Sequence, residues 1–408
     1  MSRGIDPTEL PAAKSPRLSG PTTIDSLDED ILLEIFLHLP SLATLLRAAL
    51  TCRSWRRAVA SSPAFRRRFH ELHRAPLLGL VAEPQRDVVP AFAPAQHRDR
   101  DVLAAISGGD FGFALTALLD PQGYAADVPL HWHIQDCRDG YLLLANWDAE
   151  LLAAVKASTH WPDTARSSTT RNVPVSVDCH LLSSDEDPMS FQLVWLRYCK
   201  SKVQVVVFSS DTGDWFFHPW VEIEERALSN DADTHWLQFG VRSNDTLYWA
   251  FTNLEHVLKL DTATMEFSVS ELPPYLKGLQ GCHLVVGETK DGALCIVFCI
   301  GGSIFVSMNR ADDDGVVRWV LRSVDYEADA NPPEDIDTLQ AMSIVDGFVY
   351  LVTSEMVVAL CLETMKLEKL FPRSFRARHF HPYIMAWPPS LVGNYGSFAL
   401  IEDGVDNA

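Results

Sequence analysis

The chain has 408 residues, of which 47% are hydrophobic and 22% charged, so it is long enough to bury a sizeable core in more than one domain. Its formal net charge of −20 is unevenly divided: residues 1–75 carry 11 basic and 8 acidic side chains (net +3), and residues 76–408 carry 23 basic and 46 acidic ones (net −23). The acidic part repels phosphate backbones, which argues against nucleic-acid binding and favours a basic protein segment as a ligand, although the charge can also simply maintain solubility.

The two ends of the chain and its cysteines indicate an intracellular setting. Residues 1–23 contain four prolines and no apolar run of a signal peptide, so we expect a disordered tail there and a second short tail at residues 403–408. The eight cysteines include no C-x-x-C pair, which argues against a zinc module and suits a reducing compartment. We therefore expect the protein in the cytoplasm, the nucleus or both.

Residues 24–75 have the pattern of a small helical module. Capping and acidic side chains around Asp28 precede apolar residues at helical spacing, and Pro40 ends this first helix. The same spacing predicts a second helix from about residue 41 to 49 and a third from about 52 to 60, with one or two further turns leading out. Three helices this short cannot cover all of their own apolar surface, so part of it is expected to meet a partner.

The order and spacing of residues in segment 27–65 resemble an F-box. The matching residues are Leu27, Glu29, Asp30, Ile31, Leu32, Glu34, Ile35, Leu39, Pro40, Leu45, Ala48, Cys52, Arg53, Trp55, Arg56, Val59, Pro63 and Phe65. The family usually has proline after the first leucine, whereas this chain has Asp28, which can still begin a helix but lacks the rigid apolar ring.

The F-box resemblance implies docking onto a Skp-type adaptor and, through it, onto a cullin. The residues expected to contact the adaptor are Leu27, Ile31, Ile35, Leu39, Pro40, Cys52 and Trp55. For Ile35 and Trp55, internal packing is an equally open alternative. A second alternative is that the whole helical module only caps the large domain of its own chain.

Beyond Pro76 the pattern changes to short apolar runs separated by turn residues, which is typical of β-strands. Similar turns begin at Asp211, Asp261 and Glu363, spaced by one and two steps of about 50 residues, and a step between the last two falls near residue 312. Stepping backwards suggests further turns at Asp163-Thr164 and at residues 120–123. Six such turns predict a β-propeller of about six four-stranded blades over residues 76–402.

A second marker precedes several of these turns. Asp139-Gly140, Asn244-Asp245, Asp291-Gly292 and Asp346-Gly347 are each typical of a tight turn that leads into an inner strand. A ring must also be closed, and we expect strands near residues 76–81 and 397–401 to share one blade. The apolar stretch at residues 293–306 is too short to cross a bilayer and is broken by two glycines, so a buried hairpin is predicted and no membrane span. The chain thus combines a helical module with an all-β ring, an α+β multidomain fold, and the ring resembles the propellers that follow many plant F-boxes.

Signatures of catalysis and cofactor binding are missing from the sequence. No glycine-rich phosphate loop, G-x-S-x-G elbow or H-E-x-x-H motif is present. The His131-Trp132-His133 and His379-Phe380-His381 triplets place two imidazoles on one strand face, yet without a nearby ligand pair a structural role is the simpler explanation. Cys295 and Cys299 are expected to pack as small buried hydrophobes. We therefore predict no catalytic residue, metal or cofactor.

The F-box resemblance implies a non-catalytic substrate receptor of an SCF-type (Skp, cullin, F-box) ubiquitin ligase, with a protein target held on the propeller. Exposed aromatic residues such as Trp161, Trp220 or Trp236 are candidate target contacts, and each can instead belong to the core. Two other functions stay open: a scaffold that binds without degrading its partner, and a propeller that binds a small molecule or carries an enzymatic site.

Overall fold

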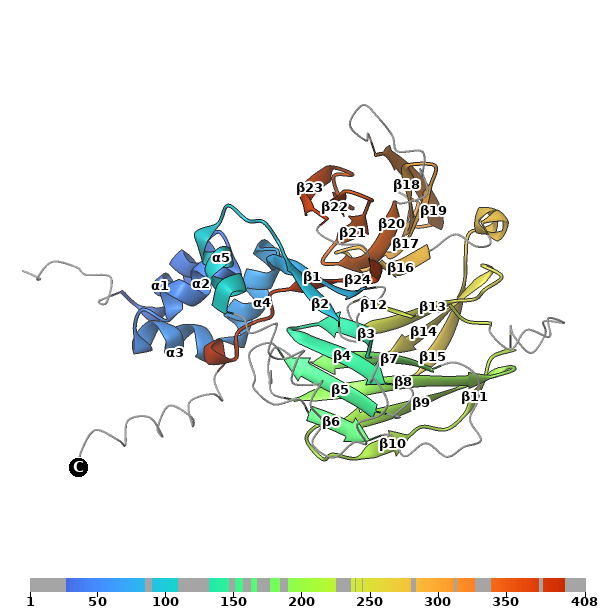
Figure 1. The fold of residues 1–408 in the computed structure, drawn as a ribbon, viewed down its shortest axis with the longest axis horizontal. Helices are drawn as coiled ribbons and strands as arrows, with labels where there is room; N and C mark the ends of the chain where they lie inside the picture. The colour runs from blue at the N-terminus through green and yellow to red at the C-terminus, as the bar shows by residue number, and fades with distance from the viewer. Residues whose placement is uncertain are drawn as a thin grey trace, which may run out of the picture.

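The computed structural model joins a helical module to a ring of six β-sheets (Figure 1). It describes residues 27–84, 90–108, 132–146, 151–156, 163–166, 177–183, 190–224, 236–238, 240–243, 245–279, 284–311, 314–326, 339–373 and 377–392. The predicted tails at residues 1–23 and 403–408 lie outside the described residues.

The helical module begins with four helices, each started by a local signal. They are α1 (Glu29–Leu37), α2 (Leu42–Ala49), α3 (Arg53–Ser61) and α4 (Pro63–Leu72). The Asp28 side chain accepts a hydrogen bond from the Glu29 N–H, and Ser41 and Ser62 cap α2 and α4 in the same way. The first three helices and the role of Asp28 in starting α1 are confirmed, and the expected extra turns form a complete ten-residue helix.

A fifth helix, α5 (Arg100–Gly108), was not predicted and lies against α2. Its Asp101 forms an ion pair with Arg47 of α2 at 3.0 Å, and its Val102 is buried in the core of the helical module. The predicted fold class, a small helical module followed by an all-β ring, is confirmed, and α5 adds one helix to that module. A nine-residue helix with one buried apolar residue shows almost no periodic pattern of hydrophobic residues in its sequence, because its other residues are exposed or half-buried.

The ring consists of six blades, numbered I to VI in chain order, and the strands of each blade follow one another from the ring axis outward. Blade I consists of β24 (Ala377–Ile384), β1 (Leu77–Pro84) and β2 (Ala91–Pro94), and blade II of β3 (His133–Arg138), β4 (Tyr141–Asn146), β5 (Leu151–Lys156) and β6 (Asp163–Arg166). Blade III consists of β7 (Val177–Ser183), β8 (Phe191–Cys199), β9 (Lys202–Ser209) and β10 (Trp215–Phe217), with β11 (Val221–Glu222) also paired with β9, and blade IV of β12 (Val241–Ser243), β13 (Thr246–Ala250), β14 (His256–Asp261) and β15 (Phe267–Glu271). Blade V consists of β16 (Leu284–Glu288), β17 (Leu294–Ile300), β18 (Ser303–Ala311) and β19 (Val317–Asp325), and blade VI of β20 (Gln340–Val345), β21 (Phe348–Val352), β22 (Met356–Cys361) and β23 (Leu367–Pro372). All pairings within the blades are antiparallel. The prediction of a six-bladed propeller is confirmed.

The tight turns predicted from Asp-Gly pairs join the axial strand of a blade to its second strand. In blades II and VI, Asp139 and Asp346 have φ of 52° and 50°, and the glycine after each has φ of 77° and 75°. Two successive residues with positive φ match the right-handed twist of a hairpin, and aspartate and glycine tolerate that conformation best. Gly301 and Gly302 also have positive φ and form the hairpin turn between β17 and β18, the second and third strands of blade V, so the predicted buried hairpin is confirmed.

The turns with a 50-residue period join the third strand of a blade to the fourth. Ser209, Asp261 and Cys361 occupy equivalent places, because each carbonyl accepts a hydrogen bond from the N–H four residues on, at Gly213, Met265 and Met365. All three donors have positive φ. The period is confirmed. The equivalent residues in the structure, Ser209 and Cys361, lie two positions before Asp211 and Glu363, which were matched by residue type, whereas Asp261 is the same in both.

One predicted turn differs from the structure, and two further predictions fall outside the described residues. Asp163-Thr164 is paired with β5 inside β6, so the prediction of a turn there is wrong, because a two-residue match holds no information about strand pairing. The turn at 120–123 and the strand at 397–401 lie outside the described residues. Blade I is closed by β24, which pairs with β1 from Leu77 opposite Ile384 to Pro84 opposite Ala377.

The helical module and the ring share one hydrophobic core. Phe36 and Phe69 of the module belong to the same buried cluster as Leu78, Tyr383 and Trp387 of the ring and its C-terminal extension. The ring of Trp387 meets Phe69 edge-on at 6.1 Å between centroids, and the short helix η5 (Pro389–Leu391) contacts α3. Since a continuous core links the two parts, the module is held in a fixed orientation on the ring.

Candidate functional site

Helix α1 is apolar on two adjacent faces, and only one of them is buried. Leu32 and Phe36 are 5% and 3% exposed and face the core, whereas Ile31 and Ile35 are 52% and 43% exposed. Leu27, four residues before Ile31, is half-buried at the start of the helix. An exposed apolar face next to a buried one is normally covered by another surface, so this face of α1 is suited to a partner. We call Leu27, Ile31 and Ile35 the α1 stripe.

The remaining predicted adaptor contacts are divided between surface and interior. Pro40 is exposed just after α1, whereas Leu39 is half-buried and packs against the module core. The Trp55 ring meets Phe36 edge-on at 5.5 Å, which makes it mainly an internal contact. Cys52 is half-buried at the N-cap of α3, with its Sγ 3.1 Å from Ser54 Oγ. Trp55 therefore packs partly inside the module, whereas Ile35 is on its surface.

The junction between the helical module and blades V and VI is polar and firmly held. Lys290 Nζ donates a hydrogen bond to the carbonyl of Glu71 in the last turn of α4, at 2.6 Å. Arg74 donates to Tyr350 Oη at 2.6 Å, lies over the Phe348 ring at 3.8 Å and pairs with Glu368 at 3.8 Å. These contacts fix the path of the chain from α4 into β1.

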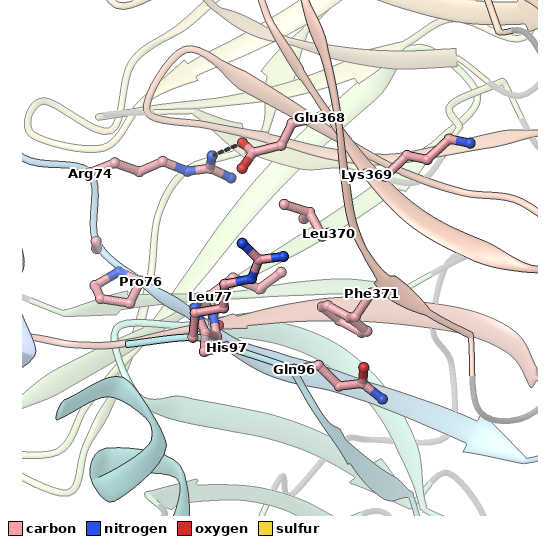
Figure 2. Close-up of a pocket in the computed structure, with 11 residues that line it drawn as sticks. Arg74, Pro76, Leu77, Gln96, His97, Glu368, Lys369, Leu370 and Phe371 are labelled. Carbon is pink, nitrogen blue, oxygen red and sulfur yellow. Dashed lines mark hydrogen bonds and ion pairs between the residues drawn. The ribbon is translucent and has the colours of Figure 1, made fainter. Parts of the chain in front are cut away.

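A cavity of about 480 Å³ opens beside this junction, as Figure 2 shows. It is lined by residues 74–77, by residues 96–98 and by residues 368–371 of β23. His97 Nε2 lies 2.8 Å from the Leu77 carbonyl, so its ring is tied to the wall. The lining comes from the segments that join helices α4 and α5 to the ring and from β23, so these residues mainly connect the helical module to the ring.

An exposed aromatic surface lies at the outer edge of blade III. Phe216, Phe217, Trp220 and Val221 are 51%, 65%, 40% and 40% exposed, and we call these outer-strand residues, which lie on both faces of the blade edge, the β10–β11 patch. Exposed aromatic clusters are typical of protein interaction sites. Of the three tryptophans predicted as target contacts, Trp220 is in this patch, Trp236 is 1% exposed and belongs to the core, and Trp161 lies outside the described residues.

Phe216 and Phe217 were not singled out from the sequence, although a signal for them was present. Successive side chains of a strand point to opposite faces, so the run Trp215-Phe216-Phe217 cannot place all three rings against one neighbouring blade. Trp215 packs against the core between blades II and III, whereas the two phenylalanines stay exposed.

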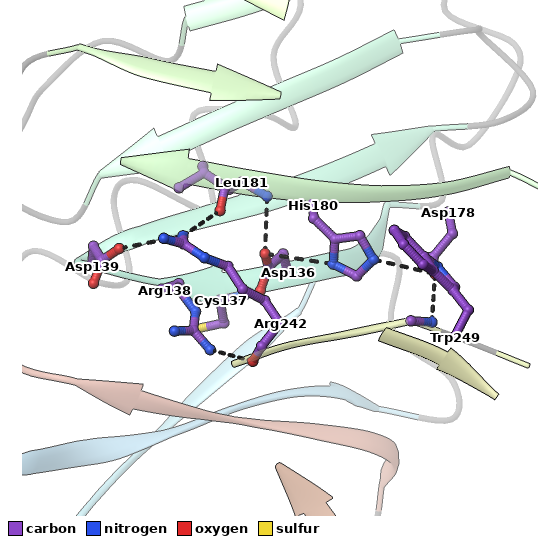
Figure 3. Close-up of polar contacts among 10 residues, drawn as sticks. Asp136, Cys137, Arg138, Asp139, Asp178, His180, Leu181, Arg242 and Trp249 are labelled. Atoms are coloured by element: carbon purple, nitrogen blue, oxygen red, sulfur yellow. Dashed lines mark hydrogen bonds and ion pairs between the residues drawn. The ribbon is translucent and has the colours of Figure 1, made fainter. Parts of the chain in front are cut away.

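A buried charged cluster links blades II, III and IV near the ring axis (Figure 3). His180 Nε2 lies 3.2 Å from Asp178 Oδ2, and its Nδ1 lies 3.9 Å from Asp136 Oδ2. Asp178 Oδ2 also accepts hydrogen bonds from Trp249 Nε1 at 2.7 Å and from the Gly240 N–H. Only glycine fits at 240, because a Cβ there would lie 2.5 Å from His180 Nε2 and 2.6 Å from Asp178 Oδ2.

Charge pairing in this cluster outweighs burial. Burial, the largest single effect, lowers the pKa of His180, but Asp178 and Asp136 together raise it above its ordinary value despite the opposing charge of Arg138. Burial likewise raises the pKa of Asp178, and the His180 charge together with the Gly240 and Trp249 hydrogen bonds brings it below its ordinary value. The two groups therefore form a buried ion pair, and the Trp249 Nε1–H and the Gly240 N–H donate hydrogen bonds to the carboxylate, which indicates a structural role.

The stability that His180 contributes is expected to depend on pH. A raised folded-state pKa means that the contribution is complete below the ordinary pKa of 6.5 and is lost as pH rises through the folded-state value. The Asp178 contribution, from a lowered pKa, is present above 3.8 and is lost as pH falls through its folded-state value. Denaturant unfolding should therefore show a larger stability difference between wild type and His180→Gln at about pH 5.5 than at about pH 9. An equal difference at both values would contradict a charged His180.

The histidine triplets and cysteines give no metal cluster among the residues that the structure describes. His133 is on β3 with Nδ1 3.7 Å from Glu83, and His381 is half-buried on β24, whereas His131 lies outside the described part. Cys295 and Cys299 both belong to or pack against the core between blades V and VI, as predicted, and burial raises the pKa of each to about 12. No helix in the described part of the chain is long and apolar enough to cross a membrane.

Comparison with known proteins identifies both parts of the chain. Residues 24–71 match the F-box-like domain, and residues 133–391 match the family described as F-box protein AT5G49610-like, beta-propeller. No curated protein matches the chain. The first match covers the helical module with the α1 stripe, and the second covers blades II to VI with β24 and η5.

Three solved structures are weakly similar to this chain in fold. They are a protein from Lactobacillus plantarum (14% identity, TM-score 0.35, 60% of this chain and 71% of that chain), a functionally unknown protein from Desulfotomaculum acetoxidans (9%, 0.38, 72% and 79%) and a nidogen/laminin complex (12%, 0.38, 75% and 98%). Scores this low add nothing to the family match, which by itself covers more than half of the sequence. The chain therefore belongs to the plant-type family of AT5G49610-like F-box proteins, in which an F-box is joined to a β-propeller.

Proposed function

We propose that this protein is the substrate-recognition subunit of an SCF-type E3 ubiquitin ligase and performs no covalent chemistry itself. The F-box-like domain supports binding to a Skp-type adaptor. The observation that carries the proposal is the α1 stripe, because Ile31 and Ile35 are half exposed on a helix whose Leu32 and Phe36 are buried in the core. Through the adaptor, the chain would be linked to a cullin.

The shared core gives this proposal a mechanical basis. Because Phe69 packs on Trp387 and Lys290 holds the end of α4, the ring cannot swing freely about the helical module. A target bound to the ring would keep a fixed position relative to the adaptor. Holding a target lysine close to the ubiquitin carrier turns a bimolecular encounter into an intramolecular one and raises the effective concentration. This is how a subunit without catalytic groups accelerates transfer.

The β10–β11 patch is our proposed target surface. Asp211 and Asp214 precede it, and Glu222 and Glu224 follow Trp220, so aromatic rings are flanked by carboxylates within an acidic domain. This chemistry fits a target segment with apolar and basic side chains, since cations bind both aromatic faces and carboxylates. The protein would act in the cytoplasm or nucleus, where its cysteines stay reduced.

The Phe217→Ser, Trp220→Ala double variant is expected to keep the adaptor and to lose targets. Each aromatic contact removed from an interface centre costs about 2 kcal/mol, so binding of a true target should fall by roughly 100-fold or more. Quantitative mass spectrometry of proteins purified with the full chain measures this, together with the half-life of each protein lost. Tyr275→Ala is the matched control, because Tyr275 is also an exposed aromatic residue, at 42%.

Three results would contradict parts of the proposal. Failure to purify an adaptor and a cullin with the wild-type chain would refute the ligase assignment. Identical partners for the Phe217→Ser, Trp220→Ala variant and wild type would refute the target surface alone. Partners that bind at the patch but keep an unchanged half-life when the protein is removed would favour the non-degradative scaffold.

A further inference from the structure

Strand β19 is an unusually long outer edge for this ring. It has nine residues, whereas the other outermost strands in the described part of the chain have three in β10, four in β2 and β6, five in β15 and six in β23. Among the residues that the structure describes, β19 pairs with β18 alone, and most of its residues are exposed. An exposed edge of this length can accept another strand.

The backbone groups available on β19 follow from its register. The Tyr326 N–H donates to the Gly302 carbonyl at 3.0 Å, continuing a ladder in which Ser303 lies opposite Asp325. Because hydrogen-bonded pairs alternate along an antiparallel ladder, the even-numbered residues of β19 bond to β18. The N–H and C=O groups of Val317, Trp319, Leu321 and Ser323 therefore point away from the blade. These groups form a row that can bond to a further strand.

The side chains of β19 differ on its two faces. Trp319 packs against the core between blades IV and V, so Val317 and Leu321 share that face and are 61% and 47% exposed. Val324 packs against the core between blades V and VI, so Arg318, Val320 and Arg322 share the opposite face. One face of the edge is thus apolar, and the other places an apolar residue between two cations.

Pairing between two copies of this chain does not suit that pattern. An antiparallel pair of β19 strands centred on Val320 would place Arg318 opposite Arg322, and like charges in that position are destabilising. Shifting the centre to Leu321 places Arg322 opposite Val320, so neither arginine meets a carboxylate. Basic residues on an edge are a common means of preventing such self-association.

A partner strand of complementary chemistry would bond to the outward backbone groups of this edge and match its side chains. Residues opposite Arg322 and Arg318 lie four positions apart, and acidic side chains there would form cross-strand pairs. The three positions between them lie opposite Leu321, Val320 and Trp319, where apolar side chains fit. The required segment is therefore acid, three apolar residues, acid. At physiological salt, charges beyond about 8 Å are screened, so the two arginines outweigh the net charge of the domain.

We propose that β19 is a docking edge that binds an extended segment of a partner protein as a fifth strand of blade V, the segment carrying two acidic residues with three apolar residues between them. This surface is separate from the β10–β11 patch and does not depend on the ligase assignment. Main-chain hydrogen bonds would supply affinity, and the arginine–carboxylate pairs would supply direction and register.

The test uses the full chain and a synthetic capped peptide with a Glu-Val-Val-Val-Glu centre, against a matched peptide with lysine in place of both glutamates. Fluorescence anisotropy is expected to show at least tenfold tighter binding of the glutamate peptide. Hydrogen exchange read by mass spectrometry should show slower exchange in residues 316–325 when that peptide is bound. Equal binding of the two peptides, no binding, or protection elsewhere would each overturn the proposal.

Two variants separate the backbone from the charge. Leu321→Pro removes an outward N–H without removing a β18 hydrogen bond, and it is expected to weaken binding at least tenfold, whereas Leu321→Thr keeps the N–H and most of the affinity. Arg322→Glu is expected to reverse the preference between the two peptides and remains informative if the proline variant fails to fold. If Arg322→Glu still preferred the glutamate peptide over the lysine peptide, the charge of β19 would not determine which peptide binds.

Discussion

Replacing Ile31 and Ile35 together by aspartate is expected to abolish adaptor binding while leaving the fold intact. Both side chains are about half exposed, so their removal takes nothing from the core, whereas in a complex they would lie at the centre of the contact. Two interface anchors of this size together contribute about 3 kcal/mol or more, which corresponds to a loss of at least roughly 100-fold in affinity. Surface plasmon resonance with a purified Skp-type adaptor measures this directly.

Leu103→Asp is the matched control for this experiment. Leu103 is on α5, is 40% exposed, and lies outside the segment that resembles an F-box. Its substitution introduces one aspartate, against two in the α1 variant, at an exposed apolar position on a helix of the same module and should leave adaptor affinity within about twofold of wild type. The α1 variant tests docking more cleanly than Leu39→Ala with Pro40→Ala, because Leu39 packs against the core and its truncation also loosens the module. Unchanged adaptor affinity in the α1 variant, with a normal melting curve, would refute docking through α1.

Replacing Asp178 by alanine is expected to cause the largest loss of stability of any change considered for the ring. The substitution leaves the His180 imidazole, the Trp249 Nε1–H and the Gly240 N–H without their shared acceptor. Removing one member of a buried ion pair costs about 3–5 kcal/mol, because the remaining charge stays buried and unpaired. Chemical denaturation followed by tryptophan fluorescence should show a lower midpoint, since Trp249 itself reports on this core.

Asp211→Ala provides the comparison for Asp178→Ala. Asp211 is exposed in the turn after β9, and its removal should change the free energy of unfolding by less than about 0.5 kcal/mol. Asp178→Asn adds a second comparison, because the amide oxygen still accepts hydrogen bonds while the charge is gone. If Asp178→Ala were as stable as Asp211→Ala, the cluster would contribute nothing to holding blades II, III and IV together.

Local signals in the sequence predicted most of the elements correctly. Ser41 and Pro40 mark the boundary between α1 and α2, because a proline cannot continue a helix and a serine caps the next one. The Asp346-Gly347 pair likewise determines a hairpin turn, since both residues tolerate positive φ. The 50-residue period then gave the number of blades. Each of these signals acts over a few residues or repeats along the chain.

Surface exposure could not be predicted in the same way. Ile31 and Leu32 are neighbours of similar hydrophobicity, yet one is 52% and the other 5% exposed. Trp220 and Trp236 looked equivalent in the sequence, and only the packing of blade IV against blade III buries the second. Periodicity predicts which residues share a face, but the neighbour that covers a face comes from elsewhere in the chain.

The amino-acid sequence by itself determined the F-box-like helices, the turn types, the repeat and hence the propeller, since caps, turns and alternation depend on residues close together. Only the tertiary structure decided that β24 closes blade I, that α5 and Trp387 join the module to the ring, and that His180 lies between Asp178 and Asp136. These features arise from contacts between segments far apart in sequence. Such contacts depend on the complementary shape and charge of surfaces that exist only once the ring is closed.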